Sequence, residues 1–472
     1  MGRYTDLVRR YLFLMVLLTA DRALAAEPVV DWEKVKAETL EHYQAVVRIN
    51  TSSPPGNETS AVTYLKSVLD REGISYQIFA LDPQRANLVA RIKGNGRKRP
   101  IAILGHTDTV GVQREKWPVD PFGAVRKDGY IWGRGTTDNK DCVTAGLMLM
   151  LQLKRLKVPL DRDVIYIAEA GEEGTNPEGI EYLVREHWPE IEAEYALAEG
   201  GFVHSENGRV RFVEIAATEK VPTGAKLIAT GTSGHGSRPR RDNAIVHLST
   251  AVSKIGSWEP PMRLNDITRT FFERLATISG PEEAARYNGL LDARKSAAVQ
   301  NYFAEHDLGK YSVLRTSISP TIVNGGFRKN VIPSEAEATL DIRALPDEDM
   351  KKFFGEIERV IGDPAVKVVP IAATRPAAPP SRLDTEMFRA LEATQRRMYP
   401  GAITVPGMVT GATDLAQLRA KGVQAYGIGP RFDEAEFAEH GWHSDVERLS
   451  EDSLHGLVQF VWYAVLGVAA SQ

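Results

Sequence analysis

The pattern of hydrophobic and polar positions before about residue 216 predicts short buried strands that alternate with amphipathic helices. The predicted helices span 32–50, 59–73, 139–156 and 178–188, and the strand-like apolar runs span 87–92, 101–104, 164–168 and 195–198. Strands that carry apolar residues on both faces are typical of parallel sheets covered by helices. We therefore expect an α/β fold with a mostly parallel sheet between helices.

The pattern changes after about residue 215. Strand-like segments of alternating polarity and two helices follow one another there, at 225–230, 242–255, 321–323, 337–342 and 347–361. They predict a smaller α+β unit inserted into the first domain, with a charged helical stretch inside it. From about residue 375 the chain returns to helices and strands, including helices at 384–398 and 451–467.

These changes divide the chain into four predicted segments. They are a first α/β part, an inserted α+β unit, a helical insertion within that unit and a second α/β part, at 32–215, 216–374, 258–312 and 375–472. The two α/β parts are expected to form one domain, which the inserted unit interrupts.

The first 26 residues resemble a signal peptide. Three arginines among the first ten residues precede an apolar run at 11–20, and Ala23-Leu24-Ala25 provides a small-x-small cleavage site. The run is too short to cross a bilayer, which takes about 20 residues. We therefore predict a secreted or periplasmic protein with no stable membrane span. Asp21 and Arg22, between the run and the cleavage site, leave an uncleaved anchor as an alternative.

Composition narrows the chemistry. The chain has 472 residues, 43% of them hydrophobic and 25% charged, and a formal net charge of −4 without a basic block, which argues against nucleic acid as a partner. Cys142 is the only cysteine, so neither an internal disulfide nor a thiolate metal cluster can form. It begins an apolar helical run, where a buried filler is favoured over a catalytic thiol. A metal ion would therefore be held by histidines and carboxylates.

Two short motifs near the ends of predicted elements carry candidate metal ligands. His106 and Asp108 end a buried strand, and because side chains on a strand repeat with a period of two, both point the same way. A carboxylate beside an imidazole can orient it for a metal, although a buried core histidine would look the same. Asp138 follows a glycine loop at the start of a helix, where it is either a helix cap or a carboxylate that bridges two ions.

Two further strands end in carboxylates. Glu172 and Glu173 follow the strand at 164–168, and Glu199 follows the strand at 195–198. Ligands of open α/β sheets commonly bind at the carboxyl ends of strands. Adjacent carboxylates repel one another unless cations lie beside them, and consecutive side chains diverge, so one can reach a metal while the other acts as a general base.

Near the carboxyl terminus, His440 and His443 offer the remaining imidazole ligands. Asp138, Glu173 and Glu199 together carry −3, so two divalent cations and one hydroxide would bring the local charge to zero. Two neutral imidazoles would then complete the coordination of both ions.

In this order and spacing, the motifs resemble the zinc metallopeptidase family of aminoacylases, carboxypeptidase G, acetylornithine deacetylase and succinyl-diaminopimelate desuccinylase. The resemblance implies two zinc ions per chain, with manganese or cobalt as alternatives because the ligands are rich in oxygen. It implies five metal ligands: His106, Asp138 as the bridge, Glu173, Glu199 and His443. Glu172 would be the general base and Asp108 would orient His106. His443 is preferred to His440 because Glu447 follows it in the family's His-x-x-x-Glu pattern.

The resemblance also assigns roles to the inserted unit, which in this family is a lid that often dimerises. His235 resembles the histidine that polarises the scissile carbonyl, often from the partner subunit; a solvated turn histidine is the alternative. Asn330, Arg343 and Gly411 resemble the residues that bind the substrate carboxylate, although Arg343 could equally form an ion pair at a strand edge. The stretch 258–312 resembles the longer, yeast vacuolar carboxypeptidase-like and N-acyl-amino-acid hydrolase branch. If its helices cover the lid's edge strand, the homodimer would be lost.

The family resemblance leads us to expect a two-zinc amidohydrolase that cleaves an amide bond next to a free α-carboxylate. Its substrate would be a small peptide, as for a carboxypeptidase or dipeptidase, and Glu172 would deprotonate a water molecule held between the metals. An N-acyl-amino-acid deacylase is the main alternative. A catalytically silent metal-binding scaffold and a peptide-capture protein are the others.

Overall fold

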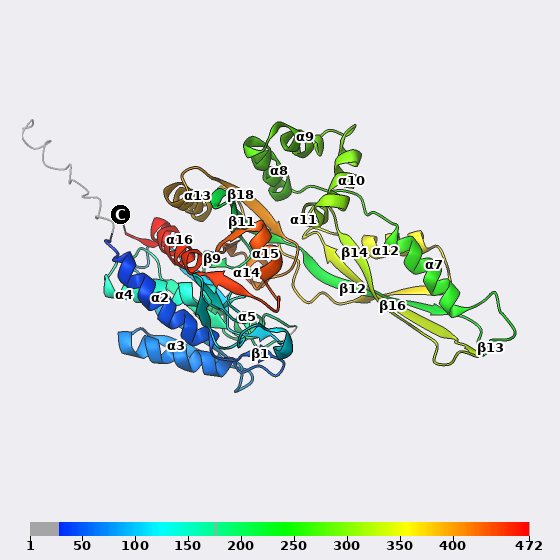
Figure 1. The fold of residues 1–472 in the computed structure, drawn as a ribbon, viewed down its shortest axis with the longest axis horizontal. Helices are drawn as coiled ribbons and strands as arrows, with labels where there is room; N and C mark the ends of the chain where they lie inside the picture. Colours follow the sequence, from blue (N-terminus) through cyan, green and yellow to red (C-terminus); the bar gives the residue numbers. More distant parts are fainter. Residues whose placement is uncertain (1–27, 175–176, 472) are drawn as a thin grey trace, which may run out of the picture.

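The computed structural model describes residues 28–174 and 177–471, so the predicted signal peptide at 1–26 lies outside the described residues. Figure 1 shows two bodies joined by a narrow connection, with a small group of helices above it. The four helices predicted before residue 216 appear as α2, α3, α4 and α5, at Trp32–Val47, Glu58–Glu72, Lys140–Arg155 and Ile180–Glu186, and a short helix that was not predicted, α6 at Trp188–Ile191, follows them. No helix in the described part of the chain has the length and apolar character needed to cross a membrane.

The larger body is built on a ten-stranded sheet. Its central strands β8, β4, β9 and β19 are parallel and span Val164–Glu169, Ile101–His106, Tyr195–Ala198 and Gln424–Gly427. On one side lie β3 and β2, Ala86–Ile92 and Tyr76–Ala80, which are antiparallel. The expected α/β fold is therefore confirmed, and parallel pairing brings the carboxyl ends of β4, β8 and β9 to one edge.

Helices cover both faces of this sheet. Helices α2, α3 and α4 share one apolar core with α13 and α16, which span Glu386–Met398 and Glu451–Ala469. Helices α5 and α6 pack on the opposite face with α14, Leu415–Ala420. The distant ends of the chain thus build one domain.

A long strand that the sequence pattern did not indicate links the two bodies. Strand β11, Arg209–Glu219, pairs with β10, Phe202–Glu206, and with β18, Ile403–Val409, and it continues through Lys220 into β12, Val221–Thr230. The chain therefore enters the second body directly from the main sheet. The remaining strand on this side, β20 at Arg431–Asp433, pairs with β10.

The smaller body is a four-stranded antiparallel sheet in the order β14-β16-β12-β17. The three new strands span Ser317–Gly325, Glu335–Ala344 and Val366–Ile371, and α7 and α12, Ala244–Gly256 and Met350–Ile361, pack on the sheet through a shared apolar core. A small pairing of β13, Gly234–His235, with β15, Val331–Ile332, lies at the end farthest from the larger body (Figure 1).

The helical insertion packs against the main sheet. Its helices α8, α9, α10 and α11 span Asp266–Ile278, Pro281–Gly289, Ser296–His306 and Leu308–Ser312. Phe272 and Leu275 of α8 share a core with Val405 and Met408 of β18. The exposed end of β14, with Ile322 and Val323 at 53% and 61% exposure, is left uncovered, so this part of the edge is open to a partner.

Candidate metal and active site

His106 is the last residue of β4, and Asp108 lies two residues after it in the loop that follows the strand. His106 Nδ1 lies 3.5 Å from Asp108 Oδ1 and 3.1 Å from the main-chain oxygen of Asp108. The Asp108 carboxylate accepts hydrogen bonds from the backbone N–H groups of Glu172 and Glu173, at 3.2 and 3.0 Å. One buried carboxylate therefore fixes both the imidazole and the loop that carries the two glutamates.

Asp138 lies between the two histidines. Its Oδ1 is 3.0 Å from His106 Nε2, and its Oδ2 is 3.2 Å from His443 Nε2. The helix-cap alternative does not describe this residue, because Asn139 is the N-cap position of α4 and makes no capping hydrogen bond through its side chain. The two carboxylate oxygens thus face opposite imidazoles, as a ligand shared by two ions must.

The other carboxylates complete two groups of ligand atoms. Among the described residues, His106, Glu172 and Glu199 form one group and Asp138, Glu173 and His443 the other, with candidate atoms in each group within 4.8 Å of one another. Oxygen and imidazole donors without thiolate fit zinc, manganese or cobalt. These donor atoms therefore fit the metals implied by the family resemblance. Glu172, the predicted general base, also lies in the first group.

Electrostatics favour a cation here. Burial raises the pKa of Glu173, and burial together with the neighbouring carboxylates raises the pKa of Glu199 to about 7. Hydrogen bonds that the His443 ring donates to Asp138 and Glu173 raise the pKa of His443 to about 10. Crowded carboxylates that hold protons in this way become stable anions beside divalent cations. Burial also raises the pKa of the Cys142 thiol, which agrees with a filler rather than a nucleophile.

The structure places His443, and not His440, beside the other candidate ligands. His443 Nε2 lies 3.1 Å from Glu173 Oε2, whereas His440 Nδ1 lies 3.2 Å from the Val446 carbonyl oxygen and its ring contacts Trp132. His443 has a φ of 60°, a left-handed backbone that is uncommon outside glycine and that occurs where the surroundings hold it.

Glu172 contacts an arginine that the sequence motifs did not indicate. Arg375 Nη2 donates to Glu172 Oε1 at 3.0 Å and to the Glu172 carbonyl oxygen at 3.1 Å, and it pairs with Asp414 at 3.2 Å. Burial raises the pKa of the Glu172 carboxyl, and Glu199 adds to the effect. Arg375 lies in a loop with no periodic pattern and no ligand motif around it, so sequence gave no signal for it.

The residues predicted to contact the substrate lie in different parts of the structure. Gly411 lines the same cavity as the ligands. His235 lies on β13, at the far end of the smaller body (Figure 1), and Asn330 is exposed beside it. Arg343 forms an ion pair with Asp341 of the same strand at 2.8 Å, as the alternative interpretation of this residue predicts. A single chain therefore does not bring His235 and Asn330 to the candidate ligands.

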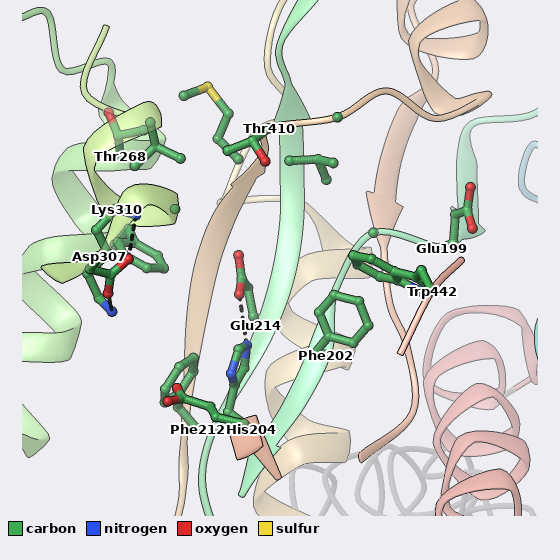
Figure 2. A pocket seen from close by; sticks show the side chains of 18 of the residues that line it. Glu199, Phe202, His204, Phe212, Glu214, Thr268, Asp307, Lys310, Thr410 and Trp442 are labelled. Carbon is green, nitrogen blue, oxygen red and sulfur yellow. Dashed lines mark hydrogen bonds and ion pairs between the residues drawn. The ribbon is translucent and has the colours of Figure 1, made fainter. Parts of the chain in front are cut away.

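A cavity of about 640 Å³ joins the ligands to the helical insertion. Figure 2 shows Glu199 and Trp442 on one side of it, Phe202 and Phe212 in the middle, and Thr268, Asp307 and Lys310 of the insertion on the other side. The volume is in the range of small-molecule sites, about 300–1,000 Å³.

The fold and the two ligand groups at the carboxyl ends of parallel strands define a candidate metal-dependent enzyme of the α/β class. The chain belongs to peptidase family M20/M25/M40, whose family model matches residues 102–466. The family resemblance seen in the motifs is thereby confirmed.

Individual relatives agree with this assignment. The chain is 30% identical over 331 residues to a carboxypeptidase S-like protein of Dictyostelium discoideum, a match that covers 67% of this chain and 62% of the relative. It is 28% identical over 375 residues to an N-fatty-acyl-amino acid synthase/hydrolase of Xenopus tropicalis (76% of this chain, 71% of the relative). It is 26% identical over 394 residues to mouse aminoacylase-1, which covers 82% of this chain and 86% of the relative.

Solved structures share the fold. An M20 metallo-carboxypeptidase from Sulfolobus solfataricus superimposes with a TM-score of 0.67 at 17% identity, covering 91% of this chain and 99% of that one. Human carnosine dipeptidase 1 gives a TM-score of 0.63 at 16% identity and covers 94% of this chain and 100% of that one.

Proposed function

We propose that this chain is a two-metal amidohydrolase that cleaves the amide bond next to a free α-carboxylate. The observation that carries the proposal is the position of Asp138, whose two oxygens lie 3.0 and 3.2 Å from the imidazoles of His106 and His443. His106, Glu199, Glu173 and His443 are the remaining proposed ligands, and zinc is the proposed metal. Bound there, two cations would polarise the scissile carbonyl and lower the pKa of water.

Glu172 is proposed as the general base. Arg375 donates a hydrogen bond to Oε1 of Glu172, and the other carboxylate oxygen is proposed to accept a proton from the attacking water molecule. Because burial raises its pKa, the carboxyl can hold that proton and deliver it to the leaving amine. Asp108 contacts both the backbone of Glu172 and the ring of His106, so it is proposed to keep the general base and the metal ligand in a fixed relative position.

The lid residues are proposed to act across a homodimer. His235 and Asn330 lie at the far end of the smaller body of their own chain (Figure 1), so a second copy would have to bring them to the ligands. The open end of β14 gives such a copy an edge to pair with. Arg343 and Gly411 are proposed to bind the substrate carboxylate. Export to the periplasm or the medium remains our proposal for its location.

Peptides with a free carboxyl terminus are the first proposed substrates, as for the relatives named carboxypeptidase and dipeptidase. The second candidate function is hydrolysis of N-acyl amino acids, as the names of the aminoacylase and N-fatty-acyl-amino acid relatives suggest. The apolar cavity wall beyond the ligands favours this second candidate.

The test is the variant Glu172→Gln, assayed on carboxyl-terminal dipeptides and on N-acyl amino acids. We expect hydrolysis to be lost while the metal content stays at two per chain, since Gln keeps the shape and loses the base. Retained hydrolysis would remove Glu172 from its role. If the wild-type protein binds metal or peptide but cleaves neither substrate class, the scaffold or the peptide-capture alternative replaces the enzyme.

A further inference from the structure

The cavity at the ligands continues away from them along an apolar surface. On the side of the main sheet it is lined by Phe202, Phe212 and Met408, and on the opposite side by Phe271 and Leu275 of α8. Phe202 also packs against Trp442 in a tilted arrangement, with ring centroids 4.9 Å apart, so the aromatic surface begins beside the proposed ligand His443. One continuous apolar path therefore runs from the proposed reaction centre to the helical insertion.

Most of the charged side chains that border this path are paired within the protein. His204 lies 2.9 Å from Glu214, Lys310 lies 2.5 Å from Asp307, and the Tyr287 hydroxyl donates to Glu283 at 2.6 Å. These groups satisfy one another, so they are poorly suited to a second ionised end of the substrate, such as the ammonium group of a long peptide. An uncharged, apolar group fits the path better.

The wall that the insertion provides is fixed to the main sheet. Arg274 of α8 donates to Glu392 of α13 and to the Thr404 carbonyl oxygen of β18, both at 2.8 Å. The same helix buries Phe272 and Leu275 against β18. Because α8 is held to the sheet that carries the proposed ligands, its cavity-facing residues keep a constant distance from them.

We propose that the insertion forms a subsite for an extended apolar acyl group and that Phe271 controls the length that the subsite accepts. This inference rests on the proposed amidohydrolase function, because it concerns the acyl side of the bond cut there. Phe271 is the residue to vary, since it is half-buried in the cavity wall whereas Leu275 is also part of the core.

The experiment measures kcat/KM for one amino acid acylated with chains from acetyl to dodecanoyl. In the wild-type protein we expect kcat/KM to rise about fourfold for each added methylene that the cavity buries, which corresponds to about 0.8 kcal/mol. Phe271→Asp should lower kcat/KM for the dodecanoyl substrate at least about tenfold and leave the acetyl substrate within about twofold, because a buried carboxylate is costly only beside the long chain. Phe271→Trp should move the optimum to shorter chains.

Arg269→Asp is the matched control, since it places the same carboxylate on an exposed position of α8. Its chain-length profile should equal that of the wild-type protein. A wild-type kcat/KM that does not rise with chain length, or equal losses for acetyl and dodecanoyl substrates in Phe271→Asp, would overturn the subsite while hydrolysis of acetyl substrates still supports the proposed function. If no N-acyl amino acid and no dipeptide is cleaved, it is the proposed function that fails.

A second inference concerns the connection between the two bodies. Arg375 follows β17 on the segment that returns to the main sheet, and the neighbouring Thr374 N–H donates to the Pro222 carbonyl oxygen at 3.2 Å, which joins both connecting segments. From this place Arg375 reaches the side chain and the backbone of Glu172. Its side chain is only 9% exposed, so the contact is enclosed.

We infer that Arg375 is a positioning residue that holds the Glu172 carboxylate for proton transfer and ties it to the connection on which the smaller body would turn. A guanidinium with several fixed donors suits this task, because it constrains direction as well as distance. A rotation at the two connecting segments would move Arg375 relative to Glu172. The base would then be correctly placed in only one orientation of the smaller body.

Arg375→Ala tests this role. We expect kcat to fall at least about tenfold with KM within about twofold and two metals still bound, because misplacing a reacting group mainly slows the chemical step. Arg375→Lys should recover only part of the loss, and added methylguanidinium should restore part of kcat in Arg375→Ala. Arg382→Ala is the control: Arg382 lies on the same segment but pairs with Asp384 at the surface. An unchanged kcat, or a loss that follows lost metal and resists methylguanidinium, would overturn the inference.

Discussion

The buried ion pair between Arg134 and Glu447, with Nη1 and Oε2 2.5 Å apart, joins the two ends of the main domain at the proposed metal site. Glu447 also accepts hydrogen bonds from the backbone N–H groups of Gly135 and Thr137, at 3.1 and 2.8 Å. Arg134 in turn lies within 3.4 Å of the His443 carbonyl oxygen. The loop before Asp138 and the segment that carries His443 are therefore one unit, although they are far apart in sequence.

Glu447→Gln should loosen this unit. The change removes the partner of a buried guanidinium, so we expect a loss of about 3 kcal/mol in the free energy of unfolding. Because His443 and Asp138 lose their support, metal affinity should fall about tenfold or more. Chemical denaturation and metal titration measure both effects. Glu451→Gln breaks the more exposed pair with Arg126 and is the control, which should leave metal affinity unchanged. Unchanged metal affinity in Glu447→Gln would contradict the coupling.

Removal of the metals should destabilise the protein. Without cations the carboxylates of Asp138, Glu173 and Glu199 lie close together, and the binding energy of the ions is lost from the folded state. At a metal concentration about a thousand times the Kd, this contribution is about 4 kcal/mol. Calorimetry with and without a chelator measures the shift in Tm, and a chelator saturated with zinc beforehand is the control. A Tm that does not respond would argue against a metal in these groups.

A mixture of two inactive variants tests whether His235 acts across a dimer. Glu172→Gln and His235→Ala should each be inactive alone, but in a mixed dimer one site receives an intact Glu172 from one chain and an intact His235 from the other. Random exchange of equal amounts should restore about a quarter of the wild-type activity, because half of the dimers are mixed and each has one complete site. The activity of the mixture after denaturation and refolding together is the measurement. No recovery, with dimers shown to exchange, would mean that His235 does not act in trans.

The smaller body should contain a pH-dependent contact. His247 Nδ1 on α7 lies 2.6 Å from Asp363 Oδ2, and Nε2 lies 3.4 Å from Asp242 Oδ1. The hydrogen bond with Asp363 raises the pKa of His247 above 6.5 in the folded state. The contact therefore contributes stability below pH 6.5, and this contribution is lost as the pH rises through the raised pKa.

The effect of His247→Gln on Tm measures this contribution. Since the side chain is partly exposed, we expect at most about 1 kcal/mol, seen at pH about 5.5 and absent at pH about 8.5. An equal effect of the substitution at both pH values would show that the contact does not depend on the charge of His247.

The sequence by itself determined the type of fold and most of the candidate ligands. Apolar strands such as 101–104 alternate with helices, and His106, Glu172 and Glu199 each follow such a strand at its carboxyl end. These features are local: a strand's period fixes where its side chains point, and parallel pairing brings neighbouring strand ends together.

Only the tertiary structure placed Arg375 on Glu172 and packed the insertion against β18, and only it showed the contact between His443, which the family pattern favours over His440, and Glu173. None of these contacts leaves a periodic pattern in the chain, because each joins segments that are distant in sequence and whose meeting depends on how whole elements pack. The position of β11 between the two bodies has the same origin, since its neighbours come from strands on both sides of the inserted unit. Local patterns report the environment of one segment, whereas contacts between segments depend on the packing of the complete chain.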